Sequence, residues 1–146
     1  MAAEDRHAIV KDLLSLPFPQ EARQLEGFSS SGPGHHVRVL QASQDFWDDR
    51  SEETVDAAEQ EIDVTYRELV ATLTAHWGDP EAVDLEPYLS GELPAAEPMG
   101  LLCLLSGEML VWRRPETGRW VALAVGQADR EFPVELLAAV GDAPLP

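Results

Sequence analysis

The sequence SEETVDAAEQEIDVTYRELVATLTAHW, residues 51–77, decides the fold of this chain. Its apolar residues recur every three or four positions, which is the spacing of one side of an α-helix. These residues are Val55, Ala58, Ile62, Tyr66, Leu69, Leu73 and Trp77. Ser51 is a suitable N-cap, and Gly78, two positions before Pro80, is a suitable C-terminal stop. The pattern therefore predicts one long helix with a single apolar side.

Four carboxylates lie beside this apolar side and are called here the acidic strip: Glu52, Asp56, Glu59 and Asp63. Their steps of four, three and four residues place them within about 60° of arc on a helix. Like charges four residues apart repel each other by about a few tenths of a kcal/mol, although an ion pair of Asp63 with Arg67 would offset part of this cost. Two interpretations remain open. The acidic strip is either a solvated face that maintains solubility or a binding site for a positively charged partner.

The charge of the whole chain indicates which partners to expect. The 146 residues include 27 acidic and 10 basic ones, for a formal net charge of −17. Residues 45–97 hold 16 of the acids and 2 of the bases, a net charge of −14. Such a surface repels phosphate groups, so we expect no direct binding to nucleic acid and none to an anionic membrane. A basic protein is the partner that this charge favours.

Three observations bear on the cellular compartment. The residues after Met1 are not a positively charged stretch followed by an apolar one, as a secretory signal peptide requires. The longest apolar run, residues 101–105, is far shorter than the about 20 residues of a membrane-spanning helix. Cys103 is the only cysteine, so no disulfide can form within the chain. Together they predict a cytoplasmic protein.

Shorter patterns around the long helix predict an α+β fold. We expect a helix over residues 3–15, strands over 35–42, 100–105, 108–114 and 119–125, and a closing helix over 133–141. Within the last strand Val121 alternates with Trp120 and Ala122, and both sets are uncharged, which indicates that both faces of the sheet are covered. The predicted architecture is an antiparallel β-meander of three or more strands packed against the long amphipathic helix and a short C-terminal helix.

The chain is expected to form a single domain over residues 1–146. No internal repeat or long linker divides the sequence. Residues 29–34, rich in Ser, Gly and Pro, are predicted to be a flexible loop, and residues 142–146 a loose tail.

Two clusters that combine tryptophan with charged residues are further candidates for binding a partner. Trp and Arg are enriched among the residues that dominate the energy of protein interfaces. The candidates are Trp47, Asp48, Asp49, Trp112, Arg113 and Arg114. The alternative is structural, because Trp112 and Trp120 lie on consecutive predicted strands and suit a cross-strand contact.

The residue types of common catalytic and metal sites are not arranged in a complete set. Cys103 lies among leucines, which is not the electropositive setting of a nucleophilic cysteine. The sequence contains no Gly-x-Ser-x-Gly and no glycine-rich phosphate loop. His35 and His36 are expected to be solvent-exposed and, as neighbours on a strand, to point to opposite faces, so that one ion would not bind both. We therefore expect no metal and no cofactor, and we expect Glu108 to be an ordinary turn residue.

These patterns predict a noncatalytic acidic protein-interaction module, comparable with an immunity protein, an antitoxin or a chaperone. Such a module would bind a basic or apolar surface of its partner. The alternative is a small enzyme or ligand-binding domain with a pocket between the sheet and the helix. In that case Tyr66, Trp112 or Trp120 would line the pocket together with a few polar groups.

Overall fold

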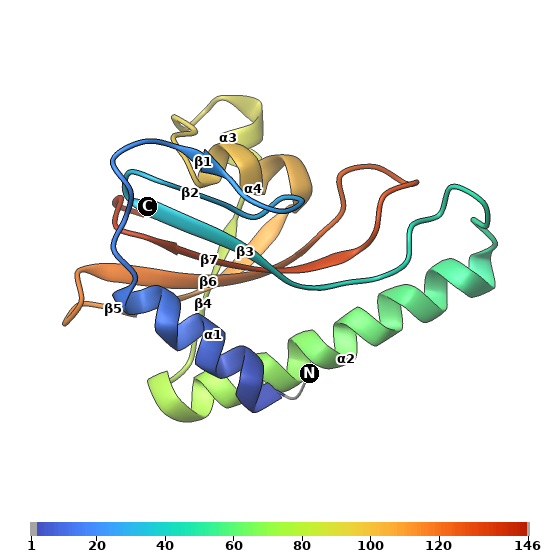
Figure 1. Cartoon of the computed structure of the whole chain (residues 1–146), viewed down its shortest axis with the longest axis horizontal. Coiled ribbons are helices and arrows are strands. Elements are labelled where there is room, and N and C mark those ends of the chain that lie inside the picture. The colour runs from blue at the N-terminus through green and yellow to red at the C-terminus, as the bar shows by residue number, and fades with distance from the viewer. Residues whose placement is uncertain (1–2, 146) are drawn as a thin grey trace.

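The computed structural model describes residues 3–145, which form an α+β fold around one seven-stranded antiparallel sheet (Figure 1). In chain order the elements are α1 (Ala3–Ser15), β1 (Arg23–Gln24), β2 (Ser30–Gly32), β3 (His35–Ala42), α2 (Glu52–Trp77), β4 (Glu81–Asp84), α3 (Glu86–Ser90), α4 (Met99–Leu105), β5 (Glu108–Arg114), β6 (Arg119–Gly126) and β7 (Glu135–Gly141). The strand order across the sheet is β1-β2-β3-β7-β6-β5-β4, and the sheet is open. The predicted α+β class is confirmed.

The long helix α2 begins and ends where the sequence predicts. The Ser51 hydroxyl accepts a hydrogen bond from the backbone N–H of Thr54 at 3.3 Å, which makes Ser51 the N-cap. At the other end Gly78 adopts a φ of +88°, and its N–H donates to the carbonyl of Thr74. The residues of the predicted apolar side are buried in the core or packed against it. The predicted helix is therefore confirmed.

The sheet has one apolar core on each face. Helices α1 and α2 cover one face, and the short helices α3 and α4 cover the other (Figure 1). Along β6, Val121 and Leu123 point into the core beneath α1 and α2, whereas Trp120 and Ala122 point into the core beneath α3 and α4. The prediction that both faces are covered is confirmed.

The helix expected over residues 133–141 is wrong, because this segment forms the central strand β7. Pro133 suits the first turn of a helix, and Leu and Ala favour helices when nothing else decides. Here all seven residues of β7 are buried between the two cores, with β3 paired on one side and β6 on the other. A strand buried on both faces has no polar alternation, so its sequence does not distinguish it from a helix.

The strand expected over residues 100–105 is also wrong, because this segment forms part of helix α4. Met99, Leu102 and Cys103 are buried against the sheet at helical spacing, while Leu104 is 65% exposed. Cys103 is thus a buried helical residue, and the observed meander consists of β5, β6 and β7. A short run of apolar residues fits either element, and only the packing decides between them.

The cross-strand contact expected between Trp112 and Trp120 is not formed. Trp112 is paired with Val121, and Trp120 with Arg113, so the two indoles lie on opposite faces of the sheet. Each indole N–H finds a backbone carbonyl instead. Trp112 donates to Gly78 at 3.0 Å, and Trp120 donates to Ala143 at 2.8 Å.

The two neighbouring histidines are buried, contrary to expectation. His35 is 5% and His36 is 1% exposed, and part of the predicted loop 29–34 forms β2, which is paired with their strand β3. His36 Nδ1 lies 2.6 Å from the Ser31 hydroxyl, and its Nε2 lies 3.0 Å from the Leu16 carbonyl.

In the predicted tail, Leu145 packs against the core beneath α3 and α4, and Pro146 lies outside the described residues. Among residues 3–145 no helix is both long enough and apolar enough to cross a membrane.

Phe46 and Trp47 provide a test of the core beneath α1 and α2. Phe46 is 0% exposed and Trp47 is 62% exposed, although they are adjacent in the loop before α2. We expect Phe46→Ala to lower the free energy of unfolding by about 3–5 kcal/mol, and Trp47→Ala by about 0.5 kcal/mol or less. Urea denaturation measures both values. Equal losses would contradict the described packing of this loop.

The contact between α1 and α2 predicts a pH dependence. The rings of His7 and His76 stack with centroids 4.4 Å apart. Burial, followed by the charges of His76 and Lys11, lowers the pKa of His7 below its usual 6.5. The unfolded chain therefore binds a proton at His7 more readily than the folded protein does. Stability is full above pH 6.5 and is lost as the pH falls from 6.5 toward the lowered folded pKa.

We expect His7→Gln to reduce this loss of stability between about pH 7.5 and about pH 5.5. Urea denaturation at a series of pH values measures it. His36, whose pKa is also lowered mainly by burial, keeps its own contribution in the variant. An unchanged pH slope in His7→Gln would show that the stacked pair has no such effect.

Candidate functional site

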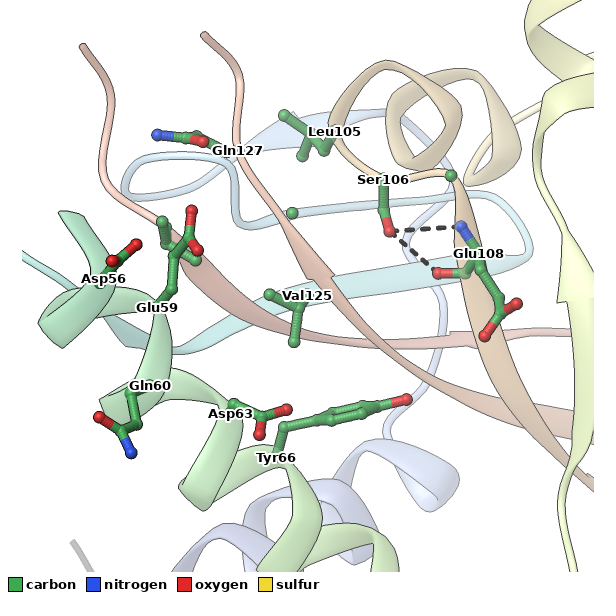
Figure 2. A pocket seen from close by; sticks show the side chains of 13 residues that line it. Asp56, Glu59, Gln60, Asp63, Tyr66, Leu105, Ser106, Glu108, Val125 and Gln127 are labelled. Carbon is green, nitrogen blue, oxygen red and sulfur yellow. Dashed lines mark hydrogen bonds between the residues drawn. The ribbon is translucent and has the colours of Figure 1, made fainter. Parts of the chain in front are cut away.

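An open groove of about 1010 Å³ lies between α2 and the ends of strands β5 and β6 (Figure 2). It is bounded by α2 on one side and on the other by the turn from α4 to β5 and the segment that follows β6. The residues lining it are Asp56, Glu59, Gln60, Asp63, Tyr66, Leu105, Ser106, Gly107, Glu108, Val125, Gly126, Gln127 and Val134. Helix and sheet thus contribute opposite walls.

Gly126 allows the wall opposite α2 to form. A Cβ atom at this position would lie 2.7 Å from the carbonyl oxygen of Leu105, a distance that no side chain tolerates. The Leu105 carbonyl accepts a hydrogen bond of 2.9 Å from the backbone N–H of Gln127. The end of α4 therefore rests directly on the end of β6. This contact places the apolar side chains of Leu105 and Val125 in the groove.

Three residues of the acidic strip, Asp56, Glu59 and Asp63, line the groove. Figure 2 shows them along α2, facing the α4–β5 turn and Gln127 across the opening. Glu52 lies nearer the start of α2, is exposed, and is not part of the lining. The expected ion pair of Asp63 with Arg67 is confirmed at 2.8 Å, and both side chains remain largely exposed. A surface pair of this kind contributes little to stability.

Glu108 and Tyr66 close the groove at its other end. Burial, followed by the charges of Glu108 and Asp63, raises the pKa of Tyr66, so its phenol stays protonated at neutral pH. Ser106 stabilises the turn before Glu108, since its hydroxyl donates to the Glu108 carbonyl at 2.9 Å (Figure 2). Glu108, expected to be an ordinary turn residue, is the first residue of β5 and lines the groove.

The chemistry of the lining favours a positively charged occupant with an apolar part. Four carboxylates surround Leu105, Val125 and Val134, and the lining contains no Lys, Arg or His. A cation placed there would relieve the mutual repulsion of the carboxylates and would meet acceptor oxygens. Within the described part of the chain, no three His, Cys, Asp or Glu side chains are grouped as the ligands of a metal ion.

The cluster around Trp47 lies in the loop before α2. The Trp47 ring is exposed and lies 5.7 Å from the ring of Phe132, in the loop between β6 and β7. Asp48 is exposed as well. Asp49 instead has a structural role, because it accepts hydrogen bonds from the Ser51 N–H at 2.9 Å and from the Thr54 hydroxyl at 2.8 Å. These bonds lower the pKa of Asp49.

The cluster around Trp112 presents its arginines rather than its indole. Trp112 is only 2% exposed, so a partner would not reach it directly. Arg113 pairs with Glu81 at 3.0 Å, on the edge strand β4. Arg114 pairs with Glu116 at 2.6 Å and lies over the ring of Trp77. Neither arginine lines the groove between α2 and the sheet, called here the acidic groove. Each arginine forms an ion pair with an acid of the same chain.

Sequence reasoning missed the far wall of the groove. The sequence pattern predicts a strand at Leu105, and Gln127 falls between the predicted elements 119–125 and 133–141. The available signal was Gly126, because a glycine at the end of an apolar strand often marks a close approach of another backbone. The partner of that approach, the Leu105 carbonyl, lies 21 positions earlier and follows only from the fold.

Comparisons of the chain with models of known protein families, with curated proteins and with solved structures find no match. The function is therefore argued from the chemistry of the groove itself.

The repulsion within the groove predicts a small gain of stability in one variant. We expect Glu59→Gln to raise the free energy of unfolding by about a few tenths of a kcal/mol at low salt, since it removes one of the neighbouring charges. In about 1 M salt the gain should vanish, because the screening length falls to about 3 Å. Glu92→Gln, which removes an exposed charge outside the groove, is the matched control. A loss of stability in Glu59→Gln would show that Glu59 makes a favourable contact.

Proposed function

We propose that this protein is a noncatalytic interaction module that binds a basic segment of a partner protein in the groove between α2 and the sheet. The observation that carries the proposal is the composition of the lining. Asp56, Glu59, Asp63 and Glu108 line the groove together with the apolar side chains of Leu105, Val125 and Val134, and the lining contains no basic residue. Immunity proteins, antitoxins and chaperones that shield a basic or apolar surface are modules of this kind. We place the interaction in the cytoplasm.

The physical properties of the two parts of the groove suggest separate roles in binding. The net charge of −17 would steer a basic partner toward the protein and raise the association rate at low salt. The apolar side chains of the lining would contribute affinity, because binding would remove their surface from water. The protonated Tyr66 phenol would donate a hydrogen bond to a backbone or side-chain oxygen of the bound segment.

A second candidate function is favoured by Tyr66, which lines the groove together with Glu108 and Gln127. A pocket between sheet and helix that holds an aromatic residue and a few polar groups also suits a small organic cation. In this second proposal the protein is a ligand-binding domain, and spermidine is a suitable probe.

The test of the proposed function compares two charge-reversal variants. Asp56→Lys with Glu59→Lys reverses two charges of the groove, and Asp79→Lys with Glu92→Lys reverses two exposed charges outside it. Basic proteins captured from the native organism at low salt are identified, and their association rates with each variant are measured. We expect the groove variant to slow association by about tenfold or more at low salt and the control variant to slow it much less.

Two results would contradict the proposal. One is an association rate that falls equally in both variants, because the total charge alone would then explain it. The other is capture that is insensitive to salt. Saturable binding of spermidine that is lost only in the groove variant, without any basic protein captured, would favour the ligand-binding domain instead.

A further inference from the structure

A second pocket, of about 350 Å³, lies between segment 16–19 after α1 and the strands β1, β2 and β3. It shares no lining residue with the acidic groove. Its lining contains Arg23 and Arg38 but no Asp or Glu, although the chain has 27 acidic residues. A positively charged pocket in so acidic a protein requires a specific arrangement of the strands.

The strand register brings the polar residues of the pocket together. Arg23 on β1 is paired with Ser31 on β2, and Ser31 is paired with His36 on β3. Residues paired across antiparallel strands project to the same side of the sheet. Arg38 follows His36 by two positions and therefore points to that side as well. Two guanidinium groups, a hydroxyl and an imidazole thus share one small area of the sheet.

The arginines at this pocket are not neutralised by the chain's own acids. Arg38 Nη1 donates to the Ser30 carbonyl at 2.8 Å and to the Ser31 hydroxyl at 3.1 Å, which holds its guanidinium in place. Arg119 is not part of the lining, but its guanidinium carbon lies 3.8 Å from the centre of the ring of Phe18, which is. The ion pairs found within residues 3–145 do not include Arg23, Arg38 or Arg119. By contrast, an acid pairs with each of Arg50, Arg67, Arg113 and Arg114.

The surroundings of the buried His36, which lines this pocket, are positively charged. Burial is the largest cause that lowers the pKa of His36, and the charges of Arg38 and Arg119 lower it further. The hydrogen bond to the Leu16 carbonyl opposes this shift in part. No acidic residue contributes to the shift. His36 is therefore a neutral neighbour at physiological pH, and the arginines supply the charge.

We propose that this pocket binds a small organic anion, in which a phosphate or carboxylate group meets Arg23 and Arg38 and an apolar body lies against Phe18 and Leu25. The guanidinium group presents its donors in a planar fork that matches the oxygens of either group. The volume falls within the range of about 300–1000 Å³ of ligand pockets. The remaining wall, residues 16–19, contributes apolar surface from Leu16 and two prolines. This anion site is independent of the proposed binding of a basic partner in the acidic groove.

The experiment is an NMR titration of the full chain with two probes, phenyl phosphate and benzoate, and with benzyl alcohol as the neutral control. We expect saturable shifts at the amides of Ser31 and His36 with a Kd of about 1 mM or tighter for at least one anion. The better probe identifies which oxyanion the pocket prefers. Arg23→Gln is the decisive variant, because the Arg23 side chain lines the pocket and is exposed. It should weaken binding by about tenfold.

Arg130→Gln is the matched control, since Arg130 is exposed and lies outside this pocket. It removes the same charge and should leave the affinity unchanged. The proposal is overturned if neither anion gives saturable shifts, if benzyl alcohol binds as well as the anions, or if Arg130→Gln weakens binding as much as Arg23→Gln. The variant Asp56→Lys with Glu59→Lys should bind the anion as the unmodified chain does, which separates this result from the outcome for the acidic groove.

Discussion

The burial of β7 on both faces is the constraint on which the rest of the structure depends. All seven residues of this strand are buried, with β3 on one side and β6 on the other. An apolar strand in this position requires a cover above and below, because exposed apolar surface is costly. Helices α1 and α2 supply one cover, and α3 and α4 supply the other (Figure 1). Gly141, whose Cβ would lie 2.5 Å from the Trp120 ring, shows how closely β7 and its neighbour β6 are packed.

The two candidate sites lie where the helices α1 and α2 extend beyond the sheet or stop short of it. Helix α2 has 26 residues, which corresponds to about 39 Å of length, and its start extends past the strands it covers (Figure 1). The apolar side of α2 is held in the core, so the neighbouring carboxylates face the opening between helix and sheet. At the opposite end, α1 stops before Pro17, and the short strands β1 and β2 leave arginines beside Phe18. Opposite charges are thus separated on one molecule, as the two proposed binding sites require.

Local patterns predicted those parts of the site that lie on a single element. The positions of Asp56, Glu59 and Asp63 followed from helical spacing, since residues three and four apart share one side of a helix. The far wall of the groove was not predictable in this way, because Leu105 and Gln127 meet through the packing of α4 on β6. The pocket that contains Arg23 and Arg38 was not predictable for the same reason. Its polar residues come from three strands, two of which are too short to give a pattern, and its apolar residues lie outside the strands.

The sequence by itself determined the long helix, its caps, the side that it buries and the charge beside that side. It also determined β3, β5 and β6, where length, turns or alternation leave one choice. Only the tertiary structure decided that residues 135–141 form a strand and residues 99–105 a helix. The physical reason is that both segments are apolar on nearly every side. A segment of this kind carries no periodic signal of its own, and it takes the conformation that the surrounding layers can bury.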